Sequence, residues 1–156
     1  ASIAPLFMIP GLLGQGMGSV IWGWVGDKKG HRITQVAVCV QSALAGVIAL
    51  LAPNAWFFAL AFWLGGMAMA SDFISTNNFM IESAPHDDKM GYVSYANTLI
   101  APIFALATVL GGAIADLTSY PFLFAVSTGI YVFGGWIMAA RVRDPRLRAR
   151  SGGPEA

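Results

Sequence analysis

The ionisable side chains are concentrated in short clusters, and the first of these clusters lies in residues 23–32. This stretch, GWVGDKKGHR, places an acid, two lysines, a histidine and an arginine between long apolar runs. Groups of these types can form ion pairs, interact with helix termini and bind anionic lipid. The sequence shows no nucleophile and base at catalytic spacing and no phosphate-binding loop. His31 and His86 lack further ligands at metal spacing. We therefore predict no enzyme activity, cofactor or metal for this chain.

A single acid, Asp72, stands inside a long apolar run. An acid within a membrane-spanning segment is energetically costly and is a functional hypothesis by default. One interpretation is a proton-coupling site. The alternative is hydrogen bonding within a local polar cluster, formed by Ser71, Ser75, Thr76, Asn77 and Asn78.

The elements that must position these groups follow from composition. The 156 residues are 56% hydrophobic and 11% charged, with a mean hydropathy of +0.65. Soluble domains carry about 25% charged residues, so the composition indicates a protein embedded in lipid. The net charge of +1 excludes a nucleic-acid partner. The single cysteine, Cys39, excludes an internal disulfide.

Five segments are long and apolar enough to cross a bilayer, which needs about 20 residues. They are residues 3–25, 34–52, 56–80, 93–115 and 121–140. Their continuous apolar character favours helices over barrel strands. We therefore predict an all-α polytopic membrane protein. Asn54 is expected to cap the third helix, Asp87 or Asp88 the fourth, and Pro121 to lie in the first turn of the fifth.

The nine lysines and arginines all fall on one side of this five-span arrangement. They are Lys28, Lys29, Arg32, Lys89, Arg141, Arg143, Arg146, Arg148 and Arg150. The positive-inside rule makes that side cytoplasmic, including the basic tail 141–156. An odd number of spans with an uncharged outer start is expected of a fragment that lacks at least one upstream span.

The first charged segment closely resembles the loop signature G-x-x-x-D-[RK]-x-G-[RK]-[RK] of major facilitator superfamily (MFS) transporters. It matches at Gly23, Asp27, Lys28, Gly30 and Arg32. It departs at His31, where the family has arginine or lysine, and histidine is charged only part of the time near neutral pH. The family's permanent ion pair is therefore not assured here.

Other segments agree with this resemblance in the correct order. ESAPHDDKMG resembles the family's E-x-x-P-x-x-x-[RK]-G through Glu82, Pro85, Lys89 and Gly91. The whole chain best resembles spans eight to twelve, in the C-terminal half of such a transporter. The rival placement is spans two to six, but its expected embedded arginine is absent.

The resemblance implies secondary active transport of a small solute by alternating access, either ion-coupled or facilitative. It implies a multi-pass protein of the plasma (inner) membrane whose partners are the solute, the lipid bilayer and the missing N-terminal half. The charged loop would then act as a latch on the cytoplasmic gate. The alternatives are a topological role for the loop and, for the protein, a transporter-like scaffold or signalling protein without flux.

In the family, the spans that correspond to the first, third and fourth segments line the cavity. Their candidate cavity residues are Gln15, Trp63, Phe104 and Thr108. Each is also explained by packing or by interhelical hydrogen bonds. We expect Glu82 to pair with Arg32 or Lys89 across the cytoplasmic face.

The glycines of the first span predict a surface for helix packing. Gly14, Gly18 and Gly26 form a small-residue face that allows close approach of another helix. Pro10 and Pro102 are candidates for kinks in the first and fourth spans.

Overall fold

The described residues form five helices joined by short connections. The computed structural model describes residues 4–84 and 87–142. The helices are α1 (Ala4–Lys29), α2 (His31–Leu51), α3 (Ala55–Ser83), α4 (Lys89–Leu117) and α5 (Tyr120–Arg141). Every regular element in these two ranges is a helix, which confirms the predicted all-α fold. Most of the predicted tail, from residue 143 onward, lies outside the described residues, as do Pro85 and His86.

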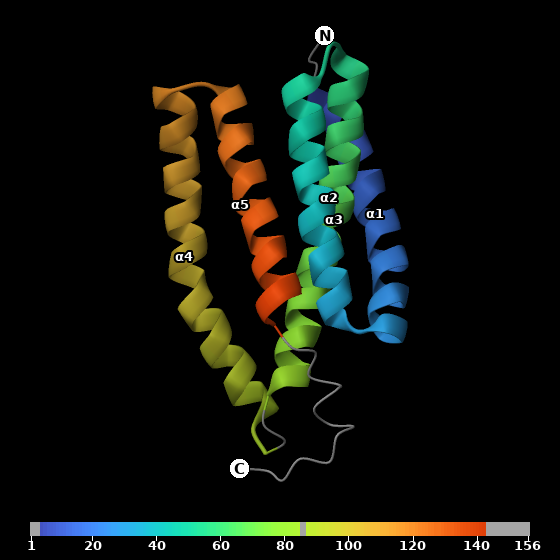
Figure 1. The fold of residues 1–156 in the computed structure, drawn as a ribbon, viewed down its shortest axis with the longest axis vertical. Coiled ribbons are helices and arrows are strands. Elements are labelled where there is room, and N and C mark those ends of the chain that lie inside the picture. The colour runs from blue at the N-terminus through green and yellow to red at the C-terminus, as the bar shows by residue number, and fades with distance from the viewer. Residues whose placement is uncertain (1–3, 85–86, 143–156) are drawn as a thin grey trace.

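Successive helices run in opposite directions (Figure 1). The α1–α2 connection, the end of α3, the start of α4 and the end of α5 therefore lie toward one end of the bundle, which we call the basic end. It carries Lys28, Lys29, Arg32, Lys89 and Arg141, the only lysines and arginines among the described residues. The opposite end holds the α2–α3 and α4–α5 connections. The charge asymmetry predicted from the sequence is thus present in the fold.

The first connection is shorter than the predicted loop. α1 continues through Asp27 and both lysines to Lys29, and α2 begins at His31, so Gly30 alone separates the helices. Gly30 has a φ of 94°, a conformation that side-chain-bearing residues rarely adopt. Its N–H still donates to the Gly26 carbonyl at 2.9 Å. One glycine therefore reverses the chain, and the charged residues lie in helical turns rather than in a loop.

The predicted helix starts are confirmed. The Asn54 side chain accepts hydrogen bonds from the Trp56 and Phe57 N–H groups at 3.1 and 3.2 Å. The Asp88 carboxylate accepts from the Gly91 N–H at 2.9 Å. Pro121 lies in the first turn of α5. These contacts satisfy amide groups that a helix start leaves without partners.

Glycines allow α1 and α3 to pack with their backbones in contact. A methyl group at Gly14 would overlap the carbonyl of Trp63, and one at Gly18 would lie 2.7 Å from the Met67 Cα. Gly66 makes the reciprocal approach to the backbone of Gly11. The Ser71 hydroxyl also lies 3.3 Å from the Gly18 carbonyl oxygen. The predicted small-residue face is therefore confirmed, and α3 is its main partner.

The second half of the chain is packed far less closely. α4 has no buried residue and α5 has one, Gly135. α4 stands at the edge of the bundle and bends along its length (Figure 1), and it contains Pro102. Most apolar side chains of α4 are exposed, as expected of a surface that lipid or further helices cover.

Four described helices, α2 to α5, are long and apolar enough to cross a membrane. α1 is 26 residues long and is not among these four helices. A fifth crossing by α1 therefore stays a prediction.

Candidate functional site

The charged motif at the basic end surrounds a buried histidine. The His31 side chain is only 4% exposed, because α2 begins directly beneath the last turn of α1. A methyl group on Gly26 would lie 2.7 Å from the His31 Nδ1. From α3, Glu82 places Oε1 at 3.8 Å from His31 Nε2. The motif therefore joins α1, α2 and α3 at a single buried imidazole.

The neighbouring arginine links this site to α5. Arg32 Nη2 donates to the carbonyl oxygen of Ala139 at 2.7 Å. Ala139 lies in the last turn of α5, where helix carbonyls lack intrahelical partners and a cation is favourable. Arg32 therefore stabilises the end of α5 at the basic end.

Three other motif residues, Gly23, Asp27 and Lys28, are not buried within the described bundle. Asp27 and Lys28 are exposed, and the Lys28 ammonium stands 4.0 Å from the centre of the Trp24 ring. Gly23 has no atom within 4 Å of the position that a Cβ would take. The close approach that this glycine permits is thus not used within the described residues.

Glu82 pairs with a residue that the sequence analysis did not name for it. Its carboxylate forms an ion pair with His31, and Arg32 donates to a carbonyl of α5. Pairing of Glu82 with Arg32 or Lys89 stays a prediction. Lys89 begins α4 and is exposed. A wider network that includes Lys89 stays a prediction.

A glutamine that the sequence did not single out connects three helices at mid-bundle. Gln41 is buried on α2. It accepts a hydrogen bond from the Trp22 indole at 2.9 Å and donates to the Leu64 carbonyl at 3.1 Å. A polar residue on an otherwise apolar helix was the available signal, because such residues commonly bond across helices in membranes.

Asp72 is held by a second glutamine of α2. Gln35 Nε2 donates to Asp72 Oδ1 at 2.7 Å and also to Thr76 Oγ1 at 3.0 Å. The Thr76 hydroxyl lies 3.3 Å from the same carboxylate oxygen. Asp72 thus bonds with one member of the predicted local cluster, Thr76, and with a partner on α2 that the sequence did not suggest.

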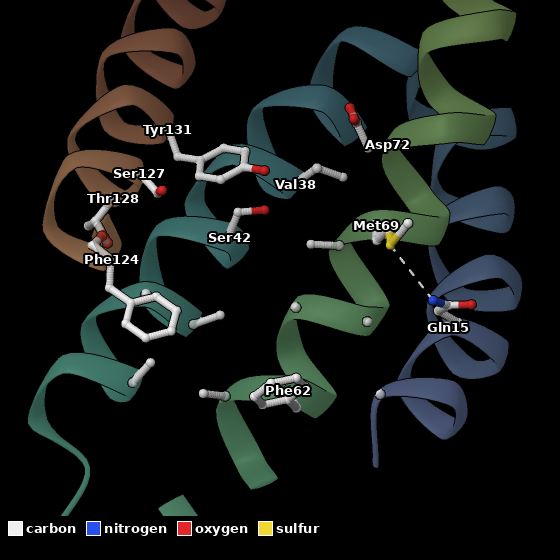
Figure 2. Close-up of a pocket in the computed structure, with 18 of the residues that line it drawn as sticks. Gln15, Val38, Ser42, Phe62, Met69, Asp72, Phe124, Ser127, Thr128 and Tyr131 are labelled. Atoms are coloured by element: carbon white, nitrogen blue, oxygen red, sulfur yellow. Dashed lines mark hydrogen bonds between the residues drawn. The ribbon is translucent and has the colours of Figure 1, made fainter. Parts of the chain in front are cut away.

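Asp72 also lines a partly open cavity of about 630 Å³, whose walls come mainly from α2, α3 and α5. Figure 2 shows the Tyr131 ring of α5 and the Ser42 hydroxyl of α2 on one side of it. Phe62 and Phe124 line its other end. The wall is mostly apolar, and Asp72 is the only aspartate, glutamate, histidine, lysine or arginine among its lining residues. A solute there would meet aromatic surfaces, a few hydroxyls and one carboxylate.

Two of the four predicted cavity residues lie on this wall. Gln15 lines it from α1, with Nε2 at 3.8 Å from the Met69 sulfur, and Phe104 lines it from α4. Trp63 and Thr108 are not among its lining residues. The Thr108 hydroxyl bonds to the Phe104 carbonyl of its own helix at 2.9 Å. A role for any of the four in solute binding stays a prediction.

Within the described residues, no group of three or more histidine, cysteine, aspartate or glutamate side chains is placed to hold a metal ion. The chemistry that this arrangement supports is hydrogen bonding at Asp72 and ion pairing at His31.

Comparison with known proteins gives one family. The family model for the Major Facilitator Superfamily matches residues 2–156. Solute carrier family 22 member 6 from Rattus norvegicus is 28% identical over 104 residues, which cover 67% of this chain and 18% of the relative. The Mus musculus protein of the same name is 30% identical over 110 residues, with 70% and 19% covered. The chain therefore spans less than a fifth of the length of these relatives.

Proposed function

The chain belongs to the major facilitator superfamily, and from this premise we propose that it forms part of a secondary transporter that moves a small solute by alternating access. It is an integral membrane protein of a family whose function is membrane transport. The observation that carries the proposal is the cavity beside Asp72, because it places a single carboxylate on an apolar wall within the bundle. Solute sites of such transporters lie between helices near the bilayer midplane.

In this proposal, Asp72 couples transport to proton movement. A carboxylate within a membrane is a functional candidate by default, and Asp72 reaches the cavity from the half of α3 nearer the basic end. Gln15 and Phe104 contribute to the same wall. Exchange of a proton at Asp72 would alter both the charge of the cavity and the α2–α3 contact.

The basic end acts as the latch of the cytoplasmic gate. His31, Glu82 and Arg32 hold α1, α2, α3 and α5 together there. The exposed Lys28 and the open face of Gly23 lie where further parts of the transporter can contact them. The positive-inside rule makes this end cytoplasmic in a plasma or inner membrane.

The remainder of the transporter is the partner that this arrangement requires. α4 buries none of its residues, and no atom lies within 4 Å of the Cβ positions of Gly111 or Gly112. Small residues on membrane helices favour helix contacts. We propose that helices of the other half cover this face in the complete protein.

The test is flux through the complete protein in liposomes that contain a pH-sensitive dye. Organic cations, organic anions, sugars and amino acids are added separately under an imposed proton gradient. We expect one class to move with protons, and Asp72→Asn to abolish that coupled accumulation while the protein remains inserted. Unchanged accumulation in Asp72→Asn at every pH would refute coupling at this residue.

A scaffold or signalling protein without flux remains the alternative function. It predicts no solute movement in any class for correctly inserted protein. Cysteine labelling from either side of the membrane provides the insertion control, because exposed positions near Lys28 should react only from the cytoplasmic side.

A further inference from the structure

The hydrogen bonding of Gln35 is asymmetric. Its Nε2 group donates twice, to Asp72 and Thr76. Its Oε1 atom is buried and has no hydrogen-bond partner in the described residues. A buried acceptor without a partner is energetically unfavourable and calls for an explanation. The unpaired oxygen belongs to the same amide that holds Asp72.

The arrangement matches one charge state of Asp72. An ionised carboxylate only accepts hydrogen bonds, so the amide must present its N–H groups, as Gln35 does. A protonated carboxyl carries an O–H donor and requires an acceptor. Turning the Gln35 amide by half a rotation would present Oε1 to that donor, and the Thr76 hydroxyl can reverse because it both donates and accepts. Gln35 and Thr76 can therefore both form hydrogen bonds with Asp72, whether it is ionised or protonated.

In the part of the chain that the structure describes, no positively charged neighbour fixes the charge state of Asp72, so its hydrogen bonds with Gln35 and Thr76 decide it. The titratable side chains that interact with Asp72 are Cys39 on α2 and Tyr131 on α5. Neither carries a positive charge. No lysine or arginine forms a salt bridge with Asp72 in residues 4–84 and 87–142. Among the described residues, the hydrogen bonds from Gln35 and Thr76 are thus the contacts that favour the ionised Asp72 carboxylate.

We propose that Gln35 is a positioning residue for Asp72, which holds the carboxylate at the cavity wall from α2 and makes the α2–α3 contact depend on whether Asp72 carries a proton. The inference rests on the proposed function, because it takes Asp72 as the group that exchanges protons. On protonation, the proton passes from the cavity to the carboxylate. The Gln35 amide turns, so that the Gln35–Asp72 hydrogen bond reverses its direction and the Gln35 Nε2–Thr76 hydrogen bond is lost. No covalent bond other than the new O–H forms or breaks within the protein.

The test is infrared difference spectroscopy of the complete protein in lipid, with the proton as the probe. The carbonyl band of a protonated carboxyl is followed as pH changes, and Asp72→Asn identifies the contribution of Asp72. In Gln35→Met, which keeps the length of the side chain but removes the amide, we expect this band to appear at a pH about one unit higher. That shift corresponds to a tenfold change in proton affinity.

Gln41→Met is the matched control, since it makes the same change on the same helix at a glutamine bonded to Trp22 and Leu64. It should leave the Asp72 band at its original pH. Thr76→Val removes the second hydrogen-bond partner of Asp72, a hydroxyl, at nearly constant side-chain volume. It should shift the Asp72 band in the same direction as Gln35→Met. This second variant keeps the proposal testable if Gln35→Met does not fold.

The outcomes separate the two proposals. A band that Asp72→Asn removes but that titrates identically in the parent, Gln35→Met and Thr76→Val overturns the role of Gln35 and leaves coupling at Asp72 intact. A spectrum in which Asp72→Asn removes no band overturns both proposals. An equal shift in Gln41→Met also overturns the inference, because a general loosening of α2 would then explain the change.

Discussion

The α1–α2–α3 bundle and the α4–α5 pair differ sharply in how they are held together. The first three helices are joined by glycine contacts, by the Gln41 and Gln35 hydrogen bonds and by the buried His31. α4 has no buried residue, and its Thr98 and Thr108 hydroxyls bond to carbonyls of their own helix. α5 reaches the bundle mainly through α2.

This contrast shows which helices have the features that drive packing within the bundle. In lipid, apolar surface does not drive helices together, so association depends on close backbone contact and interhelical hydrogen bonds. α1 and α3 have both of these features. On α4, no atom of the described residues lies within 4 Å of the Cβ positions of Gly111 and Gly112. The partner of α4 is therefore expected outside the five helices.

The largest effect should come from the glycine contact between α1 and α3. In Gly14→Ala, the new methyl overlaps the Trp63 carbonyl, which belongs to a helix backbone and cannot move independently. We expect a loss of about 1–3 kcal/mol in the free energy of unfolding, measured by denaturation of the complete protein in detergent.

Gly16→Ala is the control on the same helix, because nothing lies within 4 Å of its Cβ position. It should be neutral or slightly stabilising, since alanine favours helix over glycine. Equal losses for both variants would show that the α1–α3 contact is not the tight region that we describe.

An intermediate effect is expected at Gln41. Gln41→Met keeps the side-chain length but leaves the Trp22 indole and the Leu64 carbonyl without this partner. We expect a loss of about 1–2 kcal/mol in the same unfolding assay. Thr108→Val on α4 removes an exposed hydroxyl that bonds within its own helix and should have almost no effect. A larger loss in the free energy of unfolding for Thr108→Val than for Gln41→Met would contradict the view that α2 is held more firmly than α4.

The smallest effect tests the link between the two regions. Arg32→Gln removes the charged donor to the Ala139 carbonyl, so the last turn of α5 should open more often. We expect roughly fivefold faster amide hydrogen exchange there, equivalent to about 1 kcal/mol. Lys29→Gln removes the same charge from an exposed position and should leave that exchange unchanged. If it does not, the charge of the basic end rather than the Arg32 bond holds α5.

Local features were predictable because they depend on neighbouring residues. Asn54 and Asp88 cap helices as their positions before apolar runs suggested, and Gly14 and Gly18 form the contact face that their spacing implied. The extent of α1 was underestimated, because charged Asp27 and Lys28 were taken to end a helix. A helix can continue through such residues where they reach the membrane surface.

The candidate site was only partly predictable. Asp72 stood out as a lone acid, but its partner Gln35 lies 37 positions away on another helix. The cavity draws on five helices and includes only Gln15 and Phe104 of the four residues proposed for it. Residue spacing along a single helix cannot show which face a different helix will contact.

The sequence by itself determined the helical membrane fold and the end of the bundle that carries the positive charge. These follow from hydropathy and from the distribution of charge along the chain. Only the tertiary structure decided that His31 meets Glu82, that Gln35 holds Asp72 and that Arg32 reaches α5. The physical reason is that each pair depends on the relative rotation and height of two packed helices, which are set by contacts along their whole length.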